Sequence, residues 1–306
     1  MSRSAAASTG PDIVGLGPVG VSVTGLDSAW RASLALAIGP LAASGAPAAF
    51  GLEAESWSAA RDATSGTQIG TQLVLDAAPT DAALAVDDER SGVRARLIGG
   101  GVRLASRSGA AGNSGRVLPF CLGPPLLDAG AALLHAATIG LGGRSVLVIG
   151  PTGAGKSTAV AAARAAGLAT AGDDLAVVWD DARWRVQGLA RPVRVPPELA
   201  PEAEAIVGDL RSRVSPQGWA SGGTSELIGV ALVGHGTEGR LAPADPVAVA
   251  RSVLGAAFAT ALPSGVAPSL RMARRLAALP GWHLELAADP ADRLAAAGRD
   301  LRSLVT

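Results

Sequence analysis

The stretch VLVIGPTGAGKSTAVAAARAAG, residues 146–167, decides the fold. Its first apolar residues predict a buried strand over 145–149, and the small residues after the glycine-rich loop predict a helix over 157–166 that Gly167 closes. Residues 150–157 match the pattern G-x-x-x-x-G-K-[ST] in full, between a strand and a helix as that pattern requires. In such a loop, backbone N–H groups and the N-terminus of the helix face an anion. The stretch therefore predicts a phosphate-binding loop in an α/β domain.

The residue types of the loop assign its chemistry. Lys156 is placed to reach the β and γ phosphates of a nucleotide, and the Ser157 hydroxyl is placed to bind Mg²⁺. Lys156 is also the only lysine among 26 basic residues, which suggests a position where arginine cannot substitute. We expect the nucleotide to be held by the whole loop: Gly150, Pro151, Thr152, Gly153, Ala154, Gly155, Lys156, Ser157 and Thr158.

Two adjacent carboxylates follow the predicted helix. That helix descends about 15 Å, and a short strand over 168–171 returns a similar distance at about 3.3 Å per residue. Asp173 and Asp174 are therefore expected at the level of the phosphates. Two such carboxylates suit two tasks, one binding Mg²⁺ and the other accepting a proton from an attacking hydroxyl. We interpret Asp180-Asp181 instead as a polar turn.

The histidines differ in their expected positions. If Gly142-Gly143 forms a two-residue hairpin turn, paired residue numbers sum to 285 and His135 falls opposite Gly150. There it would contact a phosphate or orient Asp173, and a packing role is the alternative. His235 and His283 have no acidic or cysteine neighbours at ligand spacing, so we expect them to be surface residues.

The first third of the chain has a different pattern. Residues 1–10 are small and polar and predict a disordered tail. Apolar residues alternate over 93–97 and 102–106 around a glycine turn, which predicts a hairpin, and residues 68–75 predict one strand. The pair Pro124-Pro125 marks the expected boundary between a smaller β-rich N-terminal domain, residues 11–122, and a P-loop domain, residues 126–306.

Within residues 126–306 strands and helices alternate. We expect an apolar helix over 126–134, a hairpin of 175–179 with 184–187, and a strand over 227–233. Asp245-Pro246 and Asp289-Pro290 each predict a helix start, with the aspartate as N-cap. This alternation is typical of an α/β fold.

Composition excludes several classes of function. The 306 residues carry 26 basic and 26 acidic side chains, so the formal net charge is zero and nucleic acid is a poor partner. The longest charge-free run, residues 32–52, is interrupted by glycine and proline and predicts no membrane span. One cysteine, Cys121, allows no intrachain disulfide, and the start of the chain lacks a signal region, so we expect a cytoplasmic protein. The oligomeric state stays open, a homo-oligomer included.

These motifs together resemble a known family. The run Leu134-His135-Ala136, the hairpin, residues 148–158 and Gly172-Asp173-Asp174 are similar to the catalytic domain of HPr kinase/phosphorylase and its HPr-kinase-like relatives, which share a fold with the ATP-dependent phosphoenolpyruvate carboxykinases. The resemblance covers residues 126–195. It implies ATP in the loop, Mg²⁺ at Ser157 and Asp174, Asp173 as the catalytic base, and transfer of the γ-phosphoryl to a serine hydroxyl.

The sequence also departs from that family. The stretch tied to phosphorylase activity contains an arginine that Glu226-Leu-Ile-Gly229 lacks, which makes dephosphorylation and HPr itself doubtful. We therefore expect an ATP- and Mg²⁺-dependent kinase whose acceptor is a hydroxyl of a peptide, protein or small molecule, with catalysis by Asp173, Lys156 and His135. The alternatives are an ATP-hydrolysing switch or nucleotide-binding regulatory protein, and an assembly protein that binds nucleotide without turnover.

Overall fold

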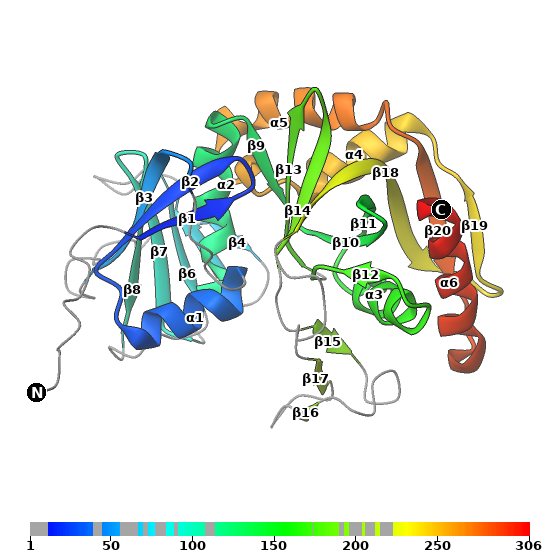
Figure 1. The fold of residues 1–306 in the computed structure, drawn as a ribbon. Coiled ribbons are helices and arrows are strands. Elements are labelled where there is room, and N and C mark those ends of the chain that lie inside the picture. Colours follow the sequence, from blue (N-terminus) through cyan, green and yellow to red (C-terminus); the bar gives the residue numbers. More distant parts are fainter. Residues whose placement is uncertain are drawn as a thin grey trace, which may run out of the picture.

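The computed structural model describes residues 12–38, 45–55, 67–69, 73–76, 84–88, 91–107, 114–172, 174–189, 193–195, 204–205, 212–214 and 223–306. Over this part the protein is a mixed α/β structure with two large sheets, one built from the N-terminal third and the other from residues beyond 130 (Figure 1). The residues expected to form a disordered tail, 1–10, lie outside the described ranges.

The N-terminal sheet has eight described strands in the order β1-β2-β3-β8-β7-β6-β5-β4. They are β1 (Asp12–Leu16), β2 (Val19–Thr24), β3 (Ala48–Ala54), β4 (Thr67–Ile69), β5 (Leu73–Asp76), β6 (Leu84–Asp88), β7 (Val93–Ile98) and β8 (Gly101–Ser106). The predicted hairpin of β7 and β8 is confirmed, with Ile98 paired to Gly101. The single strand predicted over 68–75 is wrong, because β4 and β5 are two antiparallel strands.

A helix that the sequence analysis did not anticipate, α1 (Ser28–Ile38), connects the parallel strands β2 and β3. The carboxylate of Asp27 accepts a hydrogen bond of 2.8 Å from the Trp30 backbone N–H at the start of α1. Trp30, Leu34 and Ile38 recur every four residues, which places them on one helix face, and all three are buried in the core beneath the sheet.

The helix α2 (Leu118–Asp128) replaces the helix expected over 126–134. Pro124 and Pro125 lie inside α2, where the missing N–H groups remove helix hydrogen bonds. Leu118, Leu122 and Leu126 lie on one face and are fully buried, and this burial stabilises the helix despite its prolines. The expected helix is wrong because its residues 131–134 form a strand.

The second sheet has nine described strands, with β12-β10-β11-β18-β14-β13-β9 as its main order and β20 and β19 beyond β18. They are β9 (Ala131–Leu134), β10 (Ala136–Leu141), β11 (Arg144–Ile149), β12 (Ala169–Thr170), β13 (Ala176–Asp181), β14 (Arg183–Gly188), β18 (Thr224–His235), β19 (Arg240–Pro243) and β20 (Gly281–Leu286). A smaller sheet consists of β15 (Val193–Val195), β16 (Glu204–Ala205) and β17 (Ser212–Val214). The parallel strands β11, β18 and β20 end at the same edge.

The register expected for the hairpin before the loop is confirmed. Ala136 pairs with Ile149 and Leu141 with Arg144, so paired numbers sum to 285 across Gly142-Gly143. His135 and Gly150 are therefore the next residues of the two strands beyond the last pair, Ala136 with Ile149. His135 also separates β9, which pairs with β13, from β10, which pairs with β11. A single residue thus forms the corner at which the chain passes from β9, at one end of the strand order, to β10, which lies beside β12 near the other end.

Helices cover both faces of the second sheet (Figure 1). One face carries α3 (Lys156–Ala165) and α6 (Pro290–Val305), and the other carries α4 (Pro246–Ala256) and α5 (Pro263–Leu276). Along β11, Val146 and Val148 pack toward α3 and α6, whereas Leu147 and Ile149 pack toward α4 and α5. This explains the continuous apolar run that predicted a buried strand.

The predicted ends of these helices are confirmed. Gly167 has a φ of 72°, and the Leu168 N–H donates to the Ala163 carbonyl at 2.9 Å, which closes α3. The Asp245 carboxylate accepts a bond of 2.7 Å from the Val247 N–H at the start of α4. The Asp289 carbonyl likewise accepts from the Arg293 N–H in the first turn of α6. Among the described helices, none has the length and apolar character of a membrane span.

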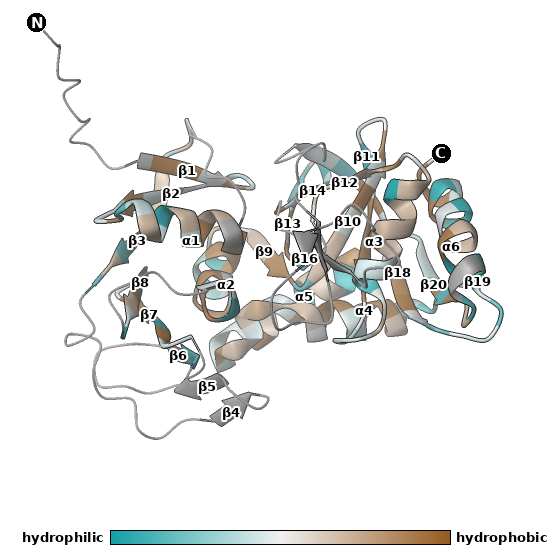
Figure 2. Cartoon of the chain, turned by 90° about the horizontal axis from the view of Figure 1, so that it is seen from below, coloured by the Kyte–Doolittle hydropathy of each residue, from teal (hydrophilic) through white to brown (hydrophobic). Residues whose placement is uncertain are grey.

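One hydrophobic cluster contains residues of both large sheets. Figure 2 shows hydrophobic residues along β9 and α5 near this junction, and Val177 and Trp179 of β13 pack with residues of the N-terminal sheet. Gly17, in the turn after β1, donates its N–H to the Gln187 side-chain oxygen at 2.5 Å. A Cβ at Gly17 would lie 2.8 Å from Val177, so glycine permits this close approach. The division into residues 11–122 and 126–306 stays a prediction.

Candidate functional site

The predicted phosphate loop connects the end of β11 to the start of α3. Gly153 and Gly155 have φ values of 84° and 104°, a backbone conformation that residues with a Cβ rarely adopt. A Cβ at Gly150 would lie 2.9 Å from Val233, and one at Gly155 would collide with Leu286. The loop therefore rests directly on the carboxyl ends of β18 and β20, and its glycines are needed both for curvature and for close approach.

Lys156 begins α3 and is 6% exposed. Its ammonium group donates to the Gly150 carbonyl at 2.8 Å and to the Pro151 carbonyl at 3.3 Å, so it lies over the first residues of the loop. Gly155 is the N-cap of α3, and no side chain of the described residues caps that helix start. The first N–H groups of α3 and the ammonium of Lys156 carry the positive charge and the donors that an anion requires. Ser157 is half-buried in the same first turn.

His135 and Asp174 lie together. The imidazole Nε2 atom is 3.3 Å from the Asp174 Oδ1 atom, with side-chain exposures of 34% and 43%. The backbone N–H of His135 donates to the Ala256 carbonyl at 2.8 Å, which fixes the corner between β9 and β10. The ring of Phe258 lies 6.2 Å from the imidazole, centroid to centroid, on the side of η3 (Phe258–Ala261).

The other predicted base, Asp173, lies outside the described residues. The chain on both sides of it is held by hydrogen bonds: Gly172 accepts from the Thr138 N–H at 3.3 Å, and the Leu175 carbonyl accepts from the Leu189 N–H at 2.9 Å. The role of Asp173 as base, and the roles of Asp174 and Ser157 as Mg²⁺ ligands, stay predictions.

The hairpin predicted around Asp180-Asp181 is confirmed, since Asp181 pairs with Arg183. Asp180 forms an ion pair with Arg275 of α5, whose guanidinium carbon also lies 5.3 Å from the ring centroid of Trp184. Asp180 therefore contributes to packing between the hairpin and α5. It is a residue of strand β13, which ends at Asp181, so the turn itself is at Ala182.

His235 is a residue of this site that the sequence analysis missed. It is exposed, as expected, but its Nε2 atom is 2.9 Å from the Gly153 carbonyl oxygen of the phosphate loop. It is the last residue of β18, a strand that runs parallel to β11 and ends at the same edge. The sequence does contain a signal for this contact, because His235 ends an apolar strand, as Gly150 follows one. Recognising it required the strand order.

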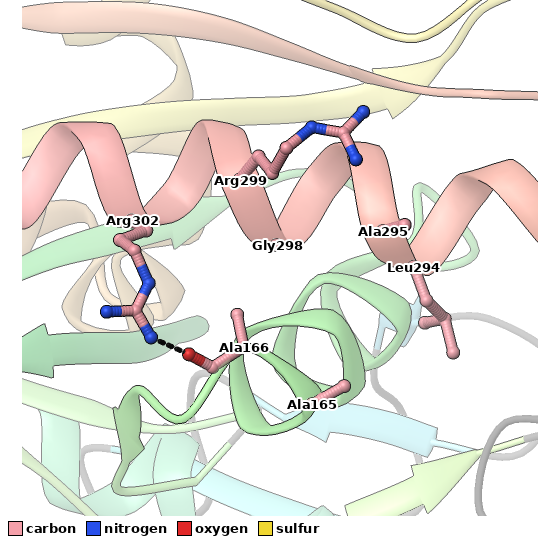
Figure 3. Close-up of a pocket in the computed structure, with 7 residues that line it drawn as sticks. All are labelled: Ala165, Ala166, Leu294, Ala295, Gly298, Arg299 and Arg302. Carbon is pink, nitrogen blue, oxygen red and sulfur yellow. Dashed lines mark hydrogen bonds between the residues drawn. The ribbon is translucent and has the colours of Figure 1, made fainter.

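A cavity of 540 Å³ lies at the other end of α3, between α3 and α6. Figure 3 shows Arg302 of α6 reaching the Ala166 carbonyl, while Arg299 points away from α3. Because α3 has 10 residues, this cavity lies about 15 Å from the phosphate loop. It is separate from the candidate site.

The residues present fit a metal–nucleotide ligand in their chemistry. A hydroxyl and carboxylates are the hard oxygen ligands that Mg²⁺ prefers, and the glycine cradle with Lys156 suits a polyphosphate. In the part of the chain that the structure describes, no group of three or more His, Cys, Asp or Glu side chains gathers at metal-binding distance. Asp173 lies outside that part of the chain.

The chain matches no family model and, by sequence, no curated protein. Among solved structures it is similar to the Hpr(Ser) kinase/phosphatase from Coxiella burnetii, with 12% identity and a TM-score of 0.32. The alignment covers 56% of this chain and 94% of that chain. A similarity of this strength establishes neither the fold nor the activity of the present chain, so its function must be inferred from its own residues.

Proposed function

We propose that this protein is a kinase of the HPr-kinase-like type, which moves the γ-phosphoryl group of ATP to a hydroxyl of a peptide, protein or small molecule in the presence of Mg²⁺. The single observation that carries the proposal is the register of β10 with β11. In this register Ala136, the residue after His135, pairs with Ile149, the residue before Gly150. The Gly150 carbonyl accepts from Lys156, and the His135 imidazole contacts Asp174.

Each residue has a proposed task. The N–H groups of the loop and of the first turn of α3, together with Lys156, hold the phosphates and offset the charge that develops during transfer. Ser157 and Asp174 are the proposed ligands of Mg²⁺, which neutralises charge between the phosphates when bound. Asp173 accepts the proton of the attacking hydroxyl, and its unprotonated form is therefore required.

His135 has a proposed positioning task. Its Nε2 atom contacts Asp174, and its backbone is fixed by the bond to Ala256, so the imidazole restrains the Asp174 carboxylate from one side. The proposed partner of His135 is therefore Asp174, whereas the sequence predicted a phosphate or Asp173 as its partner.

The test is incubation with γ-labelled ATP, Mg²⁺ and a library of serine-containing peptides and small alcohols. Transfer of label to an acceptor is expected, and Asp173→Asn should lower turnover by on the order of a hundredfold or more while ATP still binds. Asp181→Asn, at the exposed tip of the hairpin, is the matched control and should keep full activity. Release of free phosphate alone would instead identify an ATP-hydrolysing switch, and full activity of Asp173→Asn would exclude it as the base.

A further inference from the structure

The side chain of His235 contacts the phosphate loop from outside the motif. Its Nε2 atom is 2.9 Å from the Gly153 carbonyl oxygen, and its Cε1 atom lies 3.5 Å from where a Cβ of Gly155 would be. Because a carbonyl oxygen only accepts, the Nε2 atom must carry the proton and donate it. We infer that His235 is a positioning residue that fixes the orientation of the loop peptide between Gly153 and Ala154. The inference rests on the proposed nucleotide-binding function.

The physical reason lies in the geometry of one peptide group. In a trans peptide, the carbonyl of residue 153 and the N–H of residue 154 point in opposite directions. Holding the Gly153 oxygen toward His235 directs the Ala154 N–H to the other side, where it donates to the Pro151 carbonyl at 3.1 Å. The bond from His235 thereby stabilises the tight turn at the start of the loop.

Glycine makes such a restraint necessary. Gly153 and Gly155 both have positive φ, and residues without a Cβ exchange between positive and negative φ at little steric cost. The peptides around them are therefore the ones that reorient most easily. A loop that presents N–H groups to an anion loses affinity when one of its peptides turns its carbonyl toward the phosphates. His235 opposes that rotation.

The position of His235 makes the contact specific to the loop. It ends β18, and its neighbours in the strand order support the same loop: Val233 lies against Gly150, and Leu286 of β20 lies against Gly155. The imidazole itself is exposed, so it contributes little to the hydrophobic core. Removing it should change the loop without unfolding the protein.

The first experiment measures the loop directly, by hydrogen–deuterium exchange of the amides of residues 150–157 in the full chain without nucleotide. His235→Leu should speed exchange of these amides severalfold, since the restraint is lost. His235→Gln carries an amide N–H near the position of Nε2 and should restore slow exchange. His283→Leu, an exposed histidine on β20, is the matched control and should leave the loop unchanged.

The second experiment measures ATP–Mg²⁺ affinity by titration calorimetry and the kinetics of turnover. His235→Leu should raise Kd and KM for ATP about 3- to 10-fold, as expected for one lost hydrogen bond, with kcat changed less than about twofold. His235→Gln should recover most of the affinity. Equal loop exchange and equal Kd in wild type and His235→Leu would overturn the inference, as would equal defects in the Leu and Gln variants.

A failure of the proposed function and a failure of the role of His235 give different results. If the wild-type protein binds no ATP, the proposed function is wrong, whereas loop exchange still decides whether His235 orients the Gly153 peptide. If the wild-type protein binds ATP and His235→Leu matches it in both measurements, only the role of His235 is wrong.

Discussion

The Nε2 atom of His135 lies 3.3 Å from the Oδ1 atom of Asp174, although 39 positions separate the two residues in the chain. The contact follows from the pairing of β9 with β13, because His135 comes directly after β9 and Asp174 comes just before β13. The same histidine is followed by β10, which pairs with the strand that carries the phosphate loop. One corner of the sheet thus connects an acidic residue to the loop.

Asp174→Asn tests the metal role of that residue. Replacing a carboxylate by an amide removes a charged oxygen ligand while keeping the size of the side chain, so Mg²⁺ should bind more weakly. We expect the Mg²⁺ concentration for half-maximal activity to rise about tenfold or more, measured by Mg²⁺ titration at saturating ATP. Asp181→Asn serves as the control. An unchanged Mg²⁺ requirement in Asp174→Asn would remove this residue from the metal site.

Gly298 tests the packing of α6 on the loop helix α3. A Cβ there would lie 2.9 Å from the Ala162 carbonyl oxygen and 3.0 Å from the Ala166 Cβ, so Gly298→Ala should destabilise the protein by about 1–3 kcal/mol. Gly255, in α4, is exposed, and a Cβ there would meet nothing within 4 Å. Gly255→Ala should therefore stabilise the protein by about 0.5–1 kcal/mol.

Thermal unfolding of the two glycine variants measures the contrast. Gly298→Ala should lower Tm and Gly255→Ala should raise it. Shifts in the same direction would mean that helix propensity alone governs both sites and that α6 does not pack tightly on α3.

Cys121 should make stability depend on pH. Burial in α2, with a smaller contribution from the Asp87 charge, raises the pKa of its thiol far above the ordinary range. As pH rises above the unfolded value of about 8.5, the unfolded chain releases a proton that the folded chain keeps. The thiol contribution to stability is therefore fully present below that pH and declines above it, by about 1.4 kcal/mol per pH unit.

Urea unfolding between pH 7 and 10 checks this dependence against the variant Cys121→Ala, which lacks the titrating group. The stability advantage of the wild type should shrink as pH rises above about 8.5. In the native protein at pH 8, iodoacetamide should leave Cys121 unmodified, since the thiolate is the reactive form. Rapid native alkylation, or a constant difference from Cys121→Ala across the range, would be inconsistent with a buried neutral thiol.

Much of the structure around residues 136–167 could be predicted because its signals are local. The Gly142-Gly143 turn predicted the register that pairs Ala136 with Ile149, and the caps at Gly167 and Asp245 predicted helix ends within a residue or two. Each of these depends on neighbouring residues and on the period of the chain, which a single sequence contains.

The failures arose where long-range packing outweighs local preference. A helix was expected over 126–134, after Pro124-Pro125, yet the burial of three leucines keeps both prolines inside α2, which begins at Leu118. The strand expected over 68–75 is two paired strands, a distinction that the pattern of β-forming residues does not make. The bond between His235 and Gly153 joins residues 82 positions apart and depends on which strand lies beside β11, so it could not be read from spacing.

Calorimetric titration of ATP–Mg²⁺ into the wild-type protein and into Lys156→Ala tests the central claim most directly. Loss of the loop ammonium removes charge-assisted bonds to the phosphates, so affinity should fall about 10- to 100-fold or more, with the same far-ultraviolet circular dichroism in both proteins. Micromolar to millimolar binding to the wild type that weakens at least about tenfold in Lys156→Ala would support the account. No binding to the wild type, or equal binding to a folded Lys156→Ala protein, would contradict it.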